Sequence, residues 1–145
     1  METESNITGR GLRILIVEDE KMARDVTTKY LSSYGECDTA GNGEEAMELF
    51  LKSREEEDPY DVIFLDILMP RMNGRKVLER IREIEDNDGI EDCDRTRIII
   101  TSSLSDPNSI SGAFQSRCEG YLVKPFGRED LEKQLQSLGI IRSTS

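Results

Sequence analysis

The apolar run Val62–Leu65 limits the fold of this chain more than any other feature. Its residues are β-branched, aromatic or aliphatic, and turn-forming residues stand on both sides of it. Such a short run is typical of a β-strand that is buried on both faces. Asp66 follows directly, and Pro70 and Asn73-Gly74 then predict a rigid loop. Ligands of open parallel α/β sheets bind outside the carboxyl ends of the strands, where Asp66 lies. An acid here can equally be a helix cap or a turn former.

Segments with the pattern of a strand alternate with segments of helical spacing along the chain. The strands are predicted over residues 12–17, 36–40, 62–65, 97–101 and 120–123. The helices are predicted over residues 20–34, 44–54, 75–85, 106–118 and 128–138, and residues 86–96 are predicted to form an irregular acidic loop. Successive βα units of this kind favour an α/β fold, a doubly wound five-stranded parallel sheet with helices on both faces. Right-handed crossovers then bring the carboxyl ends of the strands to one edge.

The length and charge of the chain narrow its domain organisation and its partners. Its 145 residues suit one domain, expected over residues 11–139, with a flexible arm at 1–10, a short tail at 140–145 and no output domain. The formal net charge is −11, and a field of this sign repels phosphate backbones and anionic lipid heads. We therefore expect no direct binding to nucleic acid and none to membranes.

The chain contains no histidine, which removes several kinds of site: Ser-His-Asp triads, Cys-His pairs and histidine-ligated zinc. Its cysteines, Cys37, Cys93 and Cys118, are odd in number and widely spaced, which indicates reduced thiols rather than a disulfide framework. No apolar run reaches the ~20 residues of a membrane span, and the first residues lack the pattern of a signal peptide. The expected compartment is the cytoplasm.

Polar side chains follow four of the predicted strands. Glu18 and Asp19 follow the first strand, Asp66 the third, Ser102 the fourth and Lys124 the fifth. Each alone has an ordinary explanation, because acids after strands are often helix caps. Together they place carboxylates, a hydroxyl and an amine at one edge of the sheet. Three carboxylates held close together repel one another and need a cation, and oxygen ligands without histidine or thiolate suit Mg²⁺ or Mn²⁺.

The other polar groups at this edge of the sheet are suited to binding a phosphoryl group. Mg²⁺ keeps several waters and commonly shares a phosphate oxygen. Lys124 and Ser102 supply a positive charge and a hydroxyl donor, which match the other oxygens of a phosphoryl group. Asp66 is the natural nucleophile, because it is a single acid on the central strand whereas Glu18 and Asp19 pair on a neighbour. Carboxylates do accept phosphoryl groups covalently.

These residues, in this order, resemble the receiver domain of bacterial two-component response regulators, over about residues 12–138. The matching motifs are Glu18-Asp19 after Ile-Leu-Ile-Val, Asp66 in Phe-Leu-Asp-Ile-Leu-Met-Pro, Asn73-Gly74, Ser102, and Lys124-Pro125-Phe126 after Gly120-Tyr121. The resemblance implies the flavodoxin-like fold of single-domain chemotaxis-type regulators. It also implies a phosphorylation-switched signalling module that is not a conventional enzyme, although it catalyses its own phosphorylation and slow dephosphorylation.

The resemblance further implies a metal site and a phosphoacceptor. Asp66 resembles the residue that takes a phosphoryl group from a histidine kinase or a histidine phosphotransfer protein. Asp19 and Asp66 resemble direct ligands of Mg²⁺, Glu18 a ligand through water, and the backbone carbonyl of Leu68 a further ligand. Glu18 stands where the family more often has Asp, which changes the distance to the metal ion.

The remaining roles concern the response to phosphorylation. Lys124 resembles the lysine that pairs with the phosphoryl group, and the Lys124–Pro125 bond is expected to be cis. Ser102 resembles the switch hydroxyl and Tyr121 the aromatic residue that turns inward with it. The implied output is an altered surface for a downstream target protein or onward relay of the phosphoryl group, from a monomer or a phosphorylation-dependent dimer.

Two other readings use the same residues. A phosphatase of the haloacid-dehalogenase type also uses an aspartate, Mg²⁺, a hydroxyl and a lysine, but it needs a second aspartate two residues after the nucleophile, where this chain has Leu68. A degenerate receiver that binds proteins without phosphorylation would have lost part of the constellation, and every key side chain is intact here.

Overall fold

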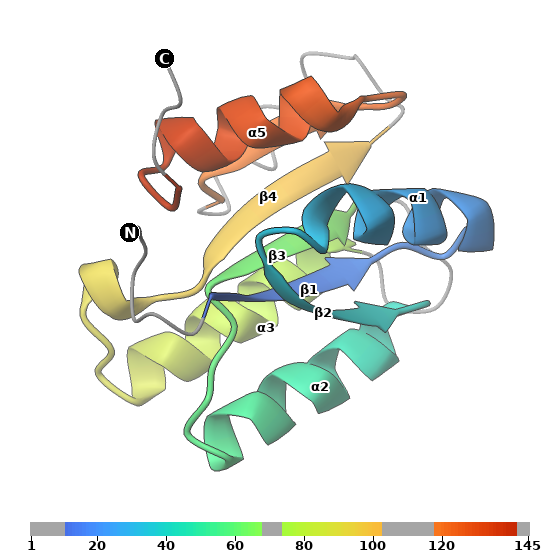
Figure 1. Cartoon of the computed structure of the whole chain (residues 1–145). Coiled ribbons are helices and arrows are strands. Elements are labelled where there is room, and N and C mark those ends of the chain that lie inside the picture. The colour runs from blue at the N-terminus through green and yellow to red at the C-terminus, as the bar shows by residue number, and fades with distance from the viewer. Residues whose placement is uncertain (1–10, 68–73, 103–117, 142–145) are drawn as a thin grey trace.

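The computed structural model describes residues 11–67, 74–102 and 118–141 of the chain. Its elements in chain order are β1 (Leu12–Val17), α1 (Lys21–Leu31), β2 (Gly35–Ala40), α2 (Gly43–Glu55), β3 (Val62–Asp66), α3 (Gly74–Asn87), the 3₁₀ helix η1 (Asp92–Asp94), β4 (Arg97–Ser102), β5 (Gly120–Val123) and α5 (Arg128–Ser137) (Figure 1).

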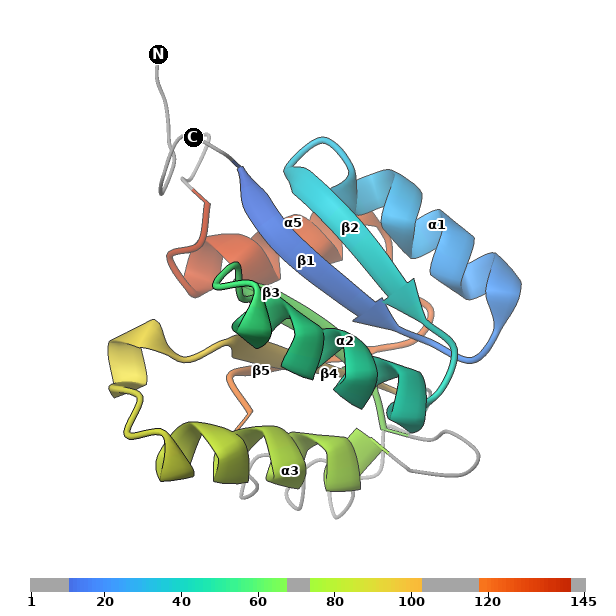
Figure 2. The same ribbon diagram turned by 90° about the horizontal axis from the view of Figure 1, so that it is seen from below.

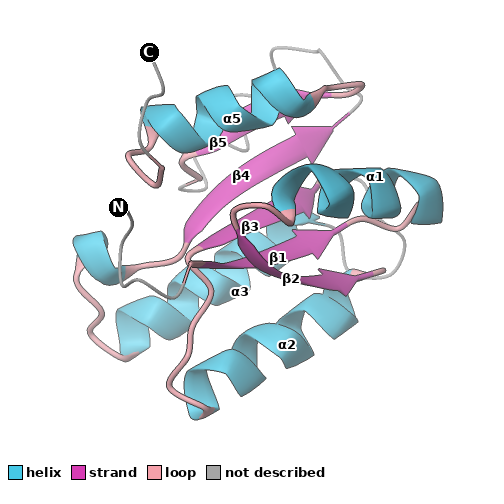
Figure 3. Ribbon diagram, in the orientation of Figure 1, coloured by secondary structure: helices cyan, strands magenta, loops and turns pink. Residues whose placement is uncertain are grey.

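The strands form one parallel sheet in the order β2-β1-β3-β4-β5 (Figure 3). Asp66 at the end of β3 is aligned with Thr101 of β4. Ser102, the last residue of β4, is aligned with Val123, the last residue of β5. The strands therefore end together at one edge of the sheet. This order and direction confirm the doubly wound, flavodoxin-like α/β fold predicted from the sequence.

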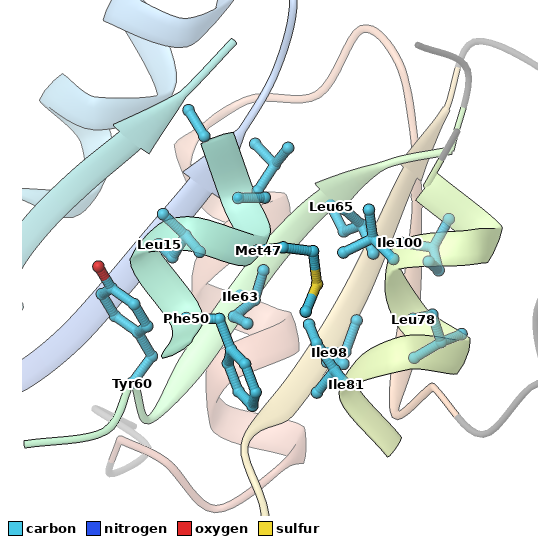
Figure 4. Close-up of a cluster of buried hydrophobic side chains, with 14 of the residues drawn as sticks. Leu15, Met47, Phe50, Tyr60, Ile63, Leu65, Leu78, Ile81, Ile98 and Ile100 are labelled. Carbon is cyan, nitrogen blue, oxygen red and sulfur yellow. The ribbon is translucent and has the colours of Figure 1, made fainter. Parts of the chain in front are cut away.

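Helices cover both faces of the sheet, with α1 and α5 on one face and α2 and α3 on the other (Figures 1 and 2). Successive side chains of a strand point to opposite faces, so a fully buried strand supplies both cores. Ile63 and Leu65 of β3 pack with Phe50 in the core beside α2 and α3 (Figure 4). Val62 and Phe64 belong to the second core, beside α1 and α5.

Capping explains why α1 is shorter than the predicted helix over residues 20–34. Glu20 is its N-cap, and the side chain of Glu20 accepts a hydrogen bond from the N–H of Ala23 at 3.0 Å. The helix ends at Leu31, and Ser32 follows as the C-cap. Tyr34 lies in the turn before β2. The other described helices and the strands agree with the prediction to within two residues at each end.

Residues 86–96 are more regular than the predicted irregular loop. The helix α3 continues to Asn87 and η1 occupies Asp92–Asp94. Arg95 holds the segment together, because its Nη1 donates to Asp86 at 2.6 Å and its Nε donates to the carbonyl of Ile90 at 3.0 Å. The side chain of Arg95 thus orders the acidic segment that connects α3 to β4.

The predicted helix over residues 106–118, the cysteines and the absence of a membrane span can be compared with the structure only in its described parts. The helix predicted over 106–118 lies outside the described residues except for Cys118, which belongs to no helix. All three cysteines are free thiols, as predicted. Among the described parts of the chain, no helix has the length and apolar character needed to cross a membrane.

A buried ion cluster ties α3 to the beginnings of β4 and β5. Arg82, only 3% exposed, donates from Nη1 to Glu85 at 2.7 Å and to the carbonyl of Thr96 at 2.8 Å. Its Nη2 donates to Glu119 at 2.7 Å. The same oxygen of Glu119 accepts the N–H of Ile98 at 2.7 Å. This cluster lies at the amino ends of the strands, away from the edge that carries Asp66.

The helix α3 begins at Gly74, where its backbone passes very close to the end of β3. The N–H of Gly74 donates to the carbonyl of Ile67 at 3.1 Å. A Cβ atom on Gly74 would lie 2.2 Å from the carbonyl oxygen of Asp66 and 2.7 Å from the Cα of Ile67. Only glycine permits this approach, so Gly74 fixes the start of α3 against the residue that ends the central strand.

The variant Gly74→Ala is therefore expected to lower the free energy of unfolding by about 1–3 kcal/mol, because the added methyl group forces the backbone apart. Urea denaturation followed by circular dichroism measures the change. Gly127→Ala is the matched control, since no heavy atom lies within 4 Å of the Cβ it would add. Equal losses of stability in the two variants would contradict the steric explanation.

Candidate functional site

Glu18 is held at the end of β1 through its main chain and its side chain. Its N–H donates to the carbonyl of Ala40 at 3.0 Å, which extends the pairing of β1 with β2. Its carbonyl accepts from Nη1 of Arg24 at 2.8 Å, and its Oε2 accepts from the N–H of Glu20 at 3.1 Å. Glu18 is only 5% exposed, whereas the neighbouring Asp19 is exposed.

Asp66 ends the central strand β3 and is 4% exposed. The N–H of Ile67 donates to the carbonyl of Thr101 at 3.1 Å, so the pairing with β4 continues one residue beyond Asp66. Ser102 follows Thr101 and is fully buried. The parallel register therefore fixes Asp66 and Ser102 at the same end of adjacent strands.

Lys124 reaches both acidic residues from the end of β5. Its N–H donates to the carbonyl of Ser102 at 2.7 Å, and the Lys124–Pro125 peptide bond is cis, as the sequence led us to expect. Its Nζ lies 2.5 Å from Oε1 of Glu18 and 3.1 Å from Oδ2 of Asp66. One ammonium group thus joins carboxylates that come from two other strands, and residues more than fifty positions apart in the chain meet here.

Burial and charge shift the pKa of two groups in this cluster. Burial raises the pKa of the Glu18 carboxyl, and its hydrogen bonds with Lys124 and Glu20 offset only part of that effect. Burial alone lowers the pKa of Lys124, but the hydrogen bonds and negative charges of Glu18 and Asp66 outweigh it and leave that pKa above its usual value. Lys124 is therefore a firmly protonated cation between carboxylates.

The carboxylates also form a group that can hold a metal ion. One oxygen from each of Glu18, Asp19 and Asp66 lies within 4.8 Å of the others. Oxygen ligands of this kind suit a hard divalent cation such as Mg²⁺, which keeps part of its water shell and so needs few protein ligands. Asp19 faces solvent and leaves room for those waters. The donor set fits Mg²⁺.

The structure brings together most of the predicted site residues that lie in its described parts. Glu18, Asp19, Asp66 and Lys124 form one cluster, and Ser102 adjoins it through the main chain of Lys124. Tyr121 is aligned with Ile100 of β4 and packs, half-buried, against the core beside α2 and α3. The predicted carbonyl ligand of Leu68 lies outside the described residues.

An apolar groove beside the cluster was not predicted from the sequence. It has a volume of about 280 Å³ and is lined by Glu18, Met22, Ala23, Val26, Thr27, Tyr30, Lys124, Pro125 and Phe126. Met22 is 73% exposed and Val26 is 45% exposed. The sequence signal that could have indicated the groove is that α1 carries more apolar residues than its buried face needs. The groove ends at Glu18 and Lys124, so it leads into the acidic cluster.

Several curated proteins are similar to this chain over most of its length. The probable C4-dicarboxylate response regulator DctR of Bacillus subtilis is 32% identical over 127 residues, which are 86% of this chain and 50% of that protein. The probable histidine kinase 2 of Oryza sativa subsp. indica is 32% identical over 138 residues, which are 88% of this chain but 13% of the kinase. The chain thus spans half or less of the length of these relatives.

Solved structures agree in fold over a larger share of both chains. A chain of the CheX–CheY complex of Borrelia burgdorferi with BeF3 and Mg²⁺ has a TM-score of 0.76 and 27% identity, and 92% of each chain is covered. The chemotaxis response regulator CheY4 of Vibrio cholerae has a TM-score of 0.74 and 28% identity, with 88% of this chain and 98% of that chain covered. The receiver domain of the histidine kinase CKI1 from Arabidopsis thaliana, complexed with Mg²⁺ and BeF3⁻, has a TM-score of 0.72 and 26% identity, with 90% of each chain covered.

The family comparison agrees with the cluster of carboxylates and lysine at the carboxyl edge of a 2-1-3-4-5 sheet. The response regulator receiver domain matches residues 14–136, which is most of the chain. Receiver domains accept a phosphoryl group on an aspartate from histidine kinases, and they are signalling modules rather than conventional enzymes. The chain belongs to the response regulator receiver domain family.

Proposed function

We propose that Asp66 is the phosphoacceptor of this receiver domain and that Glu18, Asp19 and Asp66 hold Mg²⁺ together with the backbone carbonyl of Leu68. The supporting observation is that Lys124 contacts both Glu18, which follows β1, and Asp66, which ends β3, and that one oxygen from each of Glu18, Asp19 and Asp66 lies within 4.8 Å of the others. Mg²⁺ and BeF3 in the related structures support the same assignment.

The chemistry is transfer of a phosphoryl group from a phosphohistidine of another protein to Asp66. The N–P bond of the donor breaks, an O–P bond to a carboxylate oxygen of Asp66 forms, and the imidazole nitrogen keeps the electron pair of the broken bond. A Mg²⁺ ion held by Glu18, Asp19 and Asp66 would supply positive charge to offset the charge of the phosphoryl oxygens. Lys124 supplies a second positive charge at the same place, and the nearby hydroxyl of Ser102 donates to a phosphoryl oxygen.

The domain signals through the negative charge that phosphorylation adds to Asp66. A phosphoryl group on Asp66 draws Ser102 and Lys124 toward its oxygens, which changes the end of β4 and the connection from β5 to α5. Tyr121, half-buried on β5, responds to the space that Ser102 leaves. The partners on this proposal are a cytoplasmic histidine kinase or histidine phosphotransfer protein, and a downstream protein that distinguishes the phosphorylated surface from the unphosphorylated one.

The apolar groove is the place where the phosphodonor protein docks. It joins the exposed side of α1 to Glu18 and Lys124, so a protein seated in it lies directly beside Asp66. Met22 and Val26 offer apolar area that no other described part of the chain covers. A docked donor protein buries this surface and brings its phosphohistidine to the carboxylate.

Incubation with a small-molecule phosphodonor and Mg²⁺ is expected to add one phosphoryl group to the intact protein, as seen by mass spectrometry. The variant Asp66→Asn should not gain this mass, because an amide cannot act as the nucleophile. Asp92→Asn is the control, since the side chain of Asp92 is 99% exposed and remote from the cluster. Labelling of Asp66→Asn to the same extent as the control would refute the assignment of Asp66.

Mg²⁺ is expected to stabilise the folded protein, since only the folded state brings the carboxylates together. At about one hundred times its dissociation constant, the ion adds about 2.7 kcal/mol to the free energy of unfolding. Thermal denaturation with and without Mg²⁺ measures this gain, which should be largely lost in Asp19→Asn. The control Asp25→Asn removes a carboxylate that is paired with Lys21 on the surface of α1 and should keep the gain. If Asp19→Asn keeps the stabilisation by Mg²⁺, the metal site is assigned wrongly.

The variant Met22→Lys is expected to slow phosphorylation by a cognate phosphohistidine protein by about tenfold or more, because it places a charge in the docking groove. Labelling by a small-molecule donor should stay unchanged, since that donor needs no groove. Leu51→Lys is the matched control, because Leu51 is 43% exposed on α2, outside the groove. Equal effects of the two substitutions on transfer from the protein donor would show that the groove is not the docking site.

A further inference from the structure

Arg24 reaches back from the first turn of α1 to the end of β1. Its Nη1 donates to the main-chain carbonyl of Glu18 at 2.8 Å, although the two residues are six positions apart. The N–H of Arg24 donates to the carbonyl of Glu20, the N-cap of α1, at 3.0 Å. Arg24 therefore bridges the turn between β1 and α1, and Asp19 lies within that turn.

The guanidinium group of Arg24 packs beside the residues that end β2 and follow it. A Cβ atom on Gly41 would lie 3.2 Å from Nη1 of Arg24, so the absence of a side chain at Gly41 leaves room for the guanidinium group. The residue before it, Ala40, accepts the N–H of Glu18 at 3.0 Å. Arg24 is half-buried and lies outside the set of residues that line the apolar groove. A change at Arg24 thus leaves the lining of the groove intact.

The bond from Arg24 supports two of the carboxylates without using their oxygens. It ends on a carbonyl oxygen, so both carboxylate oxygens of Glu18 stay outside this contact. Asp19 is exposed, and the main chain on either side of it therefore decides where its carboxylate lies. Groups that orient metal ligands without touching the ion have a large effect on the affinity of a metal site. Arg24 has the contacts of such a group.

We propose that Arg24 is a positioning residue for the metal site: its guanidinium group holds the main chain of Glu18 and so keeps the carboxylates of Glu18 and Asp19 in place for Mg²⁺. This inference rests on the proposed function in treating Glu18, Asp19 and Asp66 as the metal site. Arg24 acts through Glu18 and touches neither the metal ion nor the phosphoryl group.

The charge of Arg24 and its bond to Glu18 have opposite effects on metal affinity. A guanidinium cation near the carboxylates repels a divalent cation, so removal of its charge alone would strengthen the binding of Mg²⁺. Removal of a group that orients the ligands weakens that binding instead. The direction of the change in affinity therefore distinguishes positioning from repulsion.

Calorimetric titration of the unphosphorylated protein with Mg²⁺ measures this change. Arg24→Met keeps a long unbranched side chain that suits a helix, and it should bind Mg²⁺ about tenfold more weakly than the unchanged protein. Arg80→Met is the matched control, because Arg80 is exposed on α3 and its loss removes the same charge. If Arg24→Met binds Mg²⁺ as tightly as Arg80→Met, or more tightly, the proposal is overturned.

Backbone hydrogen exchange tests the same bond without any metal ion. The N–H groups of Glu18 and Glu20 are both hydrogen-bonded, and they should exchange faster in Arg24→Met than in Arg80→Met, because the main chain between them loses its anchor. The N–H of Ile98, at the other end of the sheet, is the reference for an intact fold. Equal exchange of Glu18 and Glu20 in the two variants would contradict a positioning role for Arg24.

The unchanged protein separates the role of Arg24 from the proposed function. If it binds Mg²⁺ and is labelled on Asp66 by a small-molecule donor, while Arg24→Met keeps the full affinity for Mg²⁺, only the role of Arg24 is refuted. If the unchanged protein itself binds no Mg²⁺, the metal site and the role of Arg24 are both refuted.

Discussion

The parallel register of the sheet is the constraint on which the site depends. Because β1, β3, β4 and β5 run in the same direction, their carboxyl ends meet, and Glu18, Asp66, Ser102 and Lys124 come together although they are distant in the chain. The two apolar cores hold the strands in that register, since each face of the sheet is covered by helices. Three carboxylates at one place are unfavourable without a cation, and the ammonium group of Lys124 supplies positive charge there.

The sequence was sufficient for the architecture because its strongest signals are local. The run Val62–Leu65 is apolar at every position, as expected of a short strand covered on both faces, and the acids and the lysine lie at or directly after the ends of strands. The ends of α1 were less well predicted, because the capping role of Glu20 depends on its backbone conformation and its bond to Ala23. Helical spacing alone does not contain that information.

Features that depend on three-dimensional proximity could not be obtained from the sequence. Nothing in the order of residues shows that Lys124 is closer to Glu18 than to Asp66. The groove combines α1 with residues that follow β5, and no local pattern shows that these two segments lie side by side. Arg95, which orders the acidic connection after α3, was hidden in a segment whose composition predicts an irregular loop. Each of these features depends on a side-chain contact whose partner cannot be predicted from the local sequence pattern.

The buried cluster around Arg82 has a consequence for how a signal travels through β5. Glu119, just before the strand, is clamped by Arg82 and by the N–H of Ile98, while Lys124 lies just after the other end. The start of β5 is therefore held in place through Glu119, while Lys124 follows its other end at the site. Because the start of the strand is fixed, we expect a displacement of Lys124 to move the connection to α5 rather than the whole strand.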